Sequence, residues 1–263
     1  MKRYITLLGL LVSCQLSQAA NELDINYQHQ NLKDIHDADI VKVAAKFPQY
    51  RFLDAIYSDL TFKNWDLEDS KLDKNGVSGT VVGYYDIGTS KDFAGVTQAQ
   101  YATSDLFPKS TLYQEINYRT GDKKNILLGI GIGWQDYYDD DSELFYKVGP
   151  VYYFKGGSVS YKYGKYNDSK SKLNSISANY DFNNRWKIAG TYNFGEGHWN
   201  YQDTVLLNSV NVKSSEFDVK VSRQINPETS IYMSAGKTRV KDKDTDKVSL
   251  NSDNFGVGLH YSW

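Results

Sequence analysis

Apolar and polar residues alternate with a period of two through most of the chain after residue 20. The last ten residues show the pattern most clearly: Phe255, Val257, Leu259, Tyr261 and Trp263 are apolar or aromatic, and the residues between them are small or polar. Because successive side chains of a β-strand point to opposite faces, such a run predicts a strand with one apolar face. The recurrence of the pattern predicts an all-β protein.

Fourteen segments carry this pattern or a weaker form of it. The predicted strands are 22–31, 38–46, 53–66, 76–87, 92–103, 110–120, 124–136, 143–154, 158–167, 172–182, 185–201, 212–225, 229–240 and 252–263. The segment 40–49 is the weakest, so a barrel of twelve strands is the alternative. An even count places both ends of the barrel sequence on one side of a membrane.

The connections between the predicted strands alternate in length. Short connections lie at 120–124, 155–157, 183–185 and 226–229, and longer polar ones at 136–142, 167–172, 202–212 and 241–252. Upstream, the charged segments 33–39 and 67–75 are also predicted to be loops. Tight turns on one side and long loops on the other are typical of an up-and-down antiparallel transmembrane β-barrel in an outer membrane.

A soluble β-sandwich would show the same alternation with its apolar face turned inward. Two features favour the membrane barrel: the polar face carries many charged residues, and aromatic residues gather near strand ends, as in the interfacial girdles of barrels. The mean hydropathy of −0.57 fits, since only one face in two must be apolar. The net charge of −2 and the pI of about 6.1 give no case for nucleic-acid binding.

The first nineteen residues have the character of a secretory signal peptide. Lys2 and Arg3 precede a short apolar run, and cleavage after Ala19 suits the small residues there. The alternative is lipidation at Cys14, the single cysteine of the chain. We therefore expect a signal peptide at 1–19, one barrel domain at 20–263, and contacts with outer membrane lipids and the barrel assembly machinery. The assembly signal is the terminal apolar row Phe255, Val257, Leu259, Tyr261 and Trp263.

The polar face of the predicted strands forms the candidate lumen. Its expected charged lining is Glu115, Arg119, Lys147, Lys162, Asp181, Lys187, Glu216, Asp218, Lys220 and His260. Mixed signs allow two interpretations: the charges pair and plug the lumen, or they line a wet pore for a polar solute. Glycines expected to face inward, at 129, 131, 133, 149 and 164, favour open space.

Three further groups could carry chemistry. His260 and Ser262 share a face and faintly resemble the His-x-Ser of an outer membrane lipid A deacylase. Acidic residues cluster at 137–143, although without the spacing of a calcium loop, and 195–199 combines Glu, His and Trp in a way that could contact sugar. A solvated or structural role is the simpler interpretation of each, so we expect no enzymatic activity and no cofactor.

Residues 106–168 resemble the central part of the YaiO-type outer membrane β-barrel family. The resemblance rests on the Tyr-Tyr-Asp-Asp run at 137–140, on Gly149-Pro150 followed by an aromatic strand, and on Tyr-Lys-Tyr at 161–163. It extends over most of 76–263, whereas 21–75 matches poorly. It implies an outer membrane barrel without an established activity or agreed catalytic residues, from a family of which some members occur in settings of surface polysaccharide production or export. A pore or accessory channel is the function it favours; a closed barrel that binds partners through its loops is the alternative.

Overall fold

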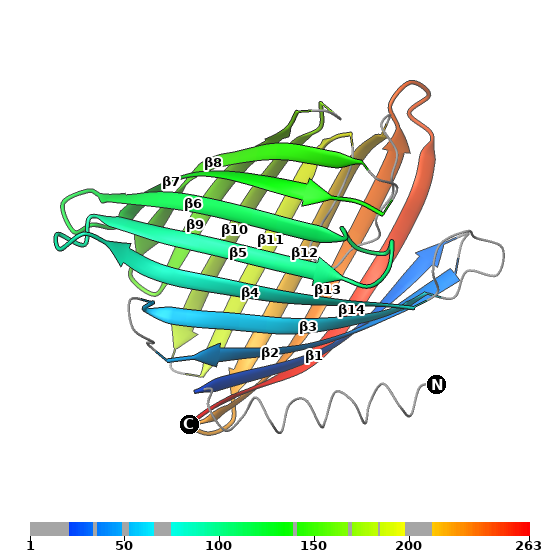
Figure 1. Cartoon of the computed structure of the whole chain (residues 1–263). Coiled ribbons are helices and arrows are strands. Elements are labelled where there is room, and N and C mark those ends of the chain that lie inside the picture. Colours follow the sequence, from blue (N-terminus) through cyan, green and yellow to red (C-terminus); the bar gives the residue numbers. More distant parts are fainter. Residues whose placement is uncertain are drawn as a thin grey trace.

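The computed structural model describes residues 21–33, 36–48, 53–65, 75–138, 141–167, 170–183, 185–197 and 212–263. These residues form fourteen antiparallel strands in one closed barrel, in which each strand pairs with its neighbours in sequence (Figure 1). The strands are β1 (Glu22–Lys33), β2 (His36–Phe47), β3 (Ala55–Trp65), β4 (Asn75–Ile87), β5 (Phe93–Ala102), β6 (Ser110–Thr120), β7 (Ile126–Asp136), β8 (Ser142–Phe154), β9 (Gly157–Tyr166), β10 (Lys172–Asn183), β11 (Trp186–Glu196), β12 (Val212–Gln224), β13 (Thr229–Asp242) and β14 (Val248–Ser262).

The first and last strands close the barrel. Leu23 lies opposite Tyr261 and Tyr27 opposite Val257, and the Trp263 N–H donates to the Asn21 carbonyl at 3.2 Å. The C terminus therefore lies beside the start of β1 (Figure 1). We call this end of the barrel the terminal rim and the opposite end, where β1 ends and β14 begins, the loop rim. The pairing of β14 with β1 closes the sheet on itself.

The strand count of fourteen is confirmed, including β2, which the sequence supported least. Two connections are shorter than predicted. The segment 33–39 is mostly strand, since β1 ends at Lys33 and β2 begins at His36; likewise β13 runs to Asp242 and β14 begins at Val248, which shortens the loop predicted at 241–252. Runs of charged residues in a sequence usually indicate a loop. Here, however, backbone hydrogen bonds to the neighbouring strand keep these residues extended at the rim, where the barrel protrudes from lipid. Residues 198–201, predicted as the end of a strand, lie outside the described residues.

The apolar face of the strands points outward. On β7, Leu128, Ile130, Ile132 and Trp134 are exposed, Ile130 to 64%, whereas the glycines between them are buried or face the interior. A soluble barrel would bury such a row, because exposing it to water is unfavourable. Contact between this apolar row and the hydrocarbon of a membrane has no such cost. The closed barrel with its outer apolar belt therefore belongs in the outer membrane. No helix of the described residues is long and apolar enough to cross a bilayer.

The inner glycines of β7 do not leave the wall bare, contrary to the sequence-based expectation. The Tyr113 ring of β6 lies over Gly131, and the Phe145 ring of β8 lies over Gly133. A β-carbon at either glycine would collide with the ring above it. Because Gly131 and Gly133 have no side chains, the large side chains of Tyr113 and Phe145 have room to lie across the inner wall.

Deleting Phe255–Trp263 should prevent assembly of the barrel. The deletion removes most of the partner of β1 and leaves backbone groups on two strand edges unsatisfied, at a cost of several kcal/mol for each group in hydrocarbon. The measurement is heat-modifiable migration on a semi-native gel. A truncated chain that reached the outer membrane and still migrated as a compact, heat-modifiable species would contradict the closure described here.

Replacing Ile130 with Arg should destabilise the folded barrel by about 2–4 kcal/mol, the cost typical of a cation near the bilayer midplane. The matched control is Gln98→Arg, which places the same side chain in the lumen, where Gln98 lines a hollow with other charged groups. Denaturant titration in lipid vesicles gives both free energies of unfolding. Equal losses for the two variants would show that the outward face of β7 does not contact lipid.

Candidate functional site

The lumen contains two adjoining recesses. The larger, of about 780 Å³, is lined by inner-facing residues from β2 to β9 and includes Glu115, Arg119 and Lys162. The smaller, of about 460 Å³, is lined from β1–β3 and β11–β14. Lys42 and Tyr57 line both recesses, so the two are neighbours within one lumen. Seven of the ten sequence-predicted lumen residues line a recess: Glu115, Arg119, Lys162, Glu216, Asp218, Lys220 and His260.

Glu115 is the centre of the charged cluster in the larger recess. It is 6% exposed, accepts a hydrogen bond from the Tyr113 hydroxyl, and lies 3.0 Å from Lys162 Nζ. Lys147 lies close by, with its Nζ 5.1 Å from the centre of the Phe145 ring and 5.3 Å from that of Tyr113. The cluster spans β6 to β9, and the glycines of β7 allow this reach. The alternation in the sequence identified Glu115, Lys147 and Lys162 as lumen residues, but it did not show that Glu115 pairs with Lys162.

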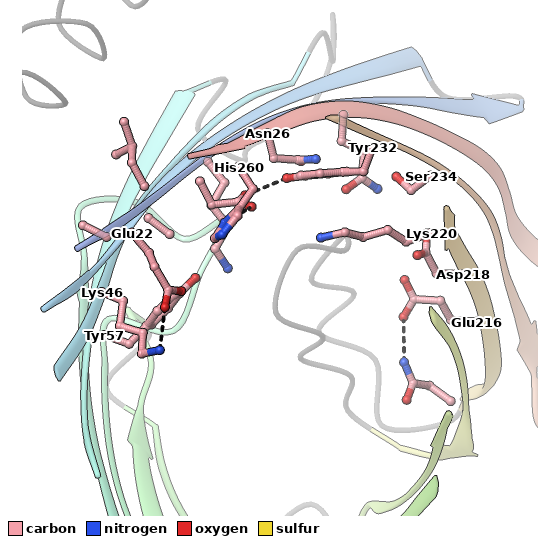
Figure 2. Close-up of a pocket in the computed structure, with 17 residues that line it drawn as sticks. Glu22, Asn26, Lys46, Tyr57, Glu216, Asp218, Lys220, Tyr232, Ser234 and His260 are labelled. Carbon is pink, nitrogen blue, oxygen red and sulfur yellow. Dashed lines mark hydrogen bonds and ion pairs between the residues drawn. The ribbon is translucent and has the colours of Figure 1, made fainter. Parts of the chain in front are cut away.

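The smaller recess has charged groups on opposite sides. Lys46 Nζ lies 2.7 Å from Glu22 Oε1, and Lys220 Nζ lies 3.7 Å from the centre of the Tyr232 ring. The Tyr232 hydroxyl donates to Asp24 at 2.6 Å. Figure 2 shows Glu216, Asp218 and Lys220 projecting from one side and Glu22, Lys46 and Tyr57 from the other. Glu22, Asp24 and Lys46 were missed at the sequence level, since their strands β1 and β2 show the alternation only weakly.

The structure supplies His260 with a neighbouring carboxylate from another strand, β1. Asp24 lies opposite His260 in the sheet, with Oδ2 3.8 Å from His260 Nδ1. Ser262, however, donates its hydroxyl to the Glu228 carbonyl at 3.5 Å, and within the described residues no hydrogen bond joins it to His260. Activation of a serine needs a direct contact with its base. The pair therefore lacks the geometry of a catalytic dyad.

Lys187 and Asp181 lie at the terminal rim rather than deep in the lumen. Their side chains are 67% and 47% exposed, with Lys187 Nζ 3.6 Å from Asp181 Oδ2. Arg119 pairs with Asp86 at 2.8 Å nearer the same rim. In the turn before β5, hydrogen bonds from Lys124 and Ser90 hold the pKa of the Asp92 carboxyl below its usual range. These pairs connect neighbouring strands and turns around the rim.

At the loop rim, apolar side chains close in on the lumen from both sides. We call this cluster the apolar plug; it comprises Ala38, Trp65, Ala102, Leu106, Phe107, Val212, Val240 and Leu250. Its centre is the segment 103–109 between β5 and β6, which folds against the inner face of β4, where Ser104 and Phe107 pack on Gly76. Leu106 is 1% exposed. The buried Lys63 lies beside the plug, with its Nζ 5.9 Å from the centre of the Phe107 ring.

The structure describes only some members of the other sequence-predicted groups. Glu143 is buried on β8 while Asp141 is exposed before it, and Asp139 and Asp140 lie outside the described residues. Among the described residues, no group of three His, Cys, Asp or Glu side chains could hold a metal ion. His198 and Trp199 of the 195–199 motif, and Cys14 and Ala19 of the predicted signal peptide, also lie outside the described residues.

Comparison with solved structures identifies the fold. Omp33, an outer membrane protein of Acinetobacter baumannii, is similar over 93% of this chain and 99% of its own, with 8% identity and a TM-score of 0.54. The KdgM porin matches over 91% and 99% with 13% identity and a TM-score of 0.45, and the CymD monoaromatic hydrocarbon channel over 94% and 90% with 9% identity and a TM-score of 0.47.

The protein is an outer membrane β-barrel. At 8% identity, the likeness to Omp33 shows the fold and no more. No family model and no curated protein matches the chain. Any function must therefore be argued from the lumen and the surface of this barrel.

Replacing Glu115 with Gln should lower the free energy of unfolding by about 1–3 kcal/mol, because the change removes the buried negative charge that pairs with Lys162 and weakens the hydrogen bond accepted from Tyr113. Asp181→Asn is the matched control, an exposed pair whose loss should cost less than about 1 kcal/mol. Denaturant titration measures both variants. If they lost the same stability, the Glu115 cluster would not be a structural centre of the lumen.

Proposed function

We propose that this protein is a pore for small polar solutes in the outer membrane. The observation that carries the proposal is the pair of adjoining polar recesses, about 780 and 460 Å³ in volume, inside a closed barrel of fourteen strands. A barrel of this size has an interior wide enough for a water-filled passage unless side chains fill it. Here side chains line the passage, and hollow space lies between them.

The lining favours uncharged, hydroxyl-rich solutes over ions. Lysines in both recesses are paired with carboxylates: Lys162 with Glu115, Lys46 with Glu22, and Lys42 with Asp59 at 3.9 Å. Paired charges give a weak net field, so neither cations nor anions are strongly attracted. Hydrogen-bonding groups and tyrosine rings remain available to a sugar-like solute. Membership of the YaiO-type family and a place in surface polysaccharide export remain predictions that agree with this lining.

The apolar plug supports a second candidate, a closed barrel that binds partners through its surface loops. Leu106 and Phe107 lie where a solute would enter from the loop rim. A hydrophobic constriction of this kind blocks passage by excluding water. The candidate binding segments are those predicted at 136–142, 202–212 and 241–252; of the second, only Val212 lies within the described residues. The two candidates differ in whether the lumen conducts once the plug is weakened.

Weakening the plug should open the pore. The double variant Leu106→Ser and Phe107→Ser makes the constriction polar, so water can enter, and its current in planar bilayers should exceed that of the wild type by several-fold. Val151→Ser is the control, since Val151 lines the larger recess away from the plug. Liposome swelling with neutral sugars should rise in parallel. A folded double variant that remained electrically silent and impermeable to sugars would reject the pore and favour the closed barrel.

A further inference from the structure

A line of basic residues crosses the outer surface of the barrel just below the loop rim. Lys165, Lys172, Glu196, Lys213 and Lys241 lie opposite one another in register on five consecutive strands, β9 to β13. By the alternation of each strand, all five point away from the lumen, on the same face as Tyr192 and Phe217. The line contains four lysines and one glutamate.

A groove of about 610 Å³ lies along this line. Lys172, Lys213, Arg239 and Lys241 border it together with the carboxylate of Glu196. Tyr192 and Phe194 lie toward the membrane from them, with ring centres 5.4 Å apart. The groove is therefore amphipathic along the barrel axis, with cations at the rim and aromatic rings next to the apolar belt. A lipid has the complementary arrangement, with a polar head group above an apolar body.

The positive charge in the groove is only partly balanced. Lys243 pairs with Glu196 at 2.9 Å and Lys241 with Asp246 at 3.0 Å. Lys172, Lys213 and Arg239 make no ion pair within the part of the chain that the structure describes.

The field of these cations reaches the neighbouring loop. A hydrogen bond from Lys241, with added attraction from Lys213 and Arg239, keeps the pKa of Asp246 below its usual range. Lysines directly opposite each other, such as Lys213 and Lys241, repel and destabilise the sheet unless an anion lies between them.

We propose that this groove binds the phosphate groups of a phosphorylated lipid in the outer leaflet, with Tyr192 and Phe194 against its apolar body. The long connections of an outer membrane barrel face the outside, which puts the loop rim at the level of the outer-leaflet head groups. The groove opens toward lipid and not into the lumen, so its occupant comes from the membrane. Lysine and arginine are the residues that bind phosphate groups most strongly.

The test uses the full-length folded barrel and bisphosphorylated lipid A in mixed micelles as the probe. The double variant Lys213→Ala and Arg239→Ala should bind lipid A about thirtyfold more weakly than the wild type. Each basic residue near an anionic lipid surface usually strengthens binding about fivefold, and this variant removes two of them. Arg223→Ala is the matched control, because Arg223 is an exposed cation on the same face of β12 at the opposite rim. The control should bind like the wild type, and all three proteins should remain heat-modifiable.

Two further probes identify what the groove binds. Dephosphorylated lipid A should bind as weakly to the wild type as lipid A does to the double variant, and raised salt should weaken binding of the phosphorylated form. Inorganic phosphate alone should bind far more weakly than lipid A, because it lacks the apolar body. Unchanged binding by the double variant, an equal loss in Arg223→Ala, or binding of free phosphate as tight as that of lipid A would each overturn the proposal.

Discussion

The backbone hydrogen bonds of strands in hydrocarbon decide the architecture of this protein. Lipid offers no partner to an exposed N–H or C=O, so each strand must have a neighbour on both edges. The chain meets this requirement through the pairing of β1 with β14, which joins residues separated by almost the whole sequence. Every other feature, from the outer apolar belt to the inner recesses, depends on this closure.

Closure separates the two faces of every strand into two environments. The outer face contacts lipid and carries large apolar residues, with basic residues beneath the loop rim. The inner face is polar and surrounds the recesses, and there the size of each residue matters as much as its charge. The glycines of β7 show this, because they let Tyr113 and Phe145 lie across the wall and let the Glu115 cluster extend to β9.

The lumen combines two features with opposite consequences for transport. Its middle and terminal part are polar and hollow, while apolar side chains around Leu106 and Phe107 pack together at its loop rim. An apolar constriction above a polar passage opposes the entry of water, and water must enter before a polar solute can cross. The same segment, 103–109, would seal a barrel whose function lies in its outer loops.

The sequence by itself determined the fold class and the two faces of the clearly alternating strands, and it favoured fourteen strands over twelve, because a period of two follows directly from strand geometry. Alternation also placed seven of the ten predicted charged residues beside a recess, although Glu22, Asp24 and Lys46 were missed. Ion-pair partners such as Asp24 for His260 came from the tertiary structure, since strands distant in the sequence supply them. The same holds for the apolar plug and for the line of lysines across β9 to β13. Alternation places a residue inside or outside the barrel, but the register between strands decides which residues meet.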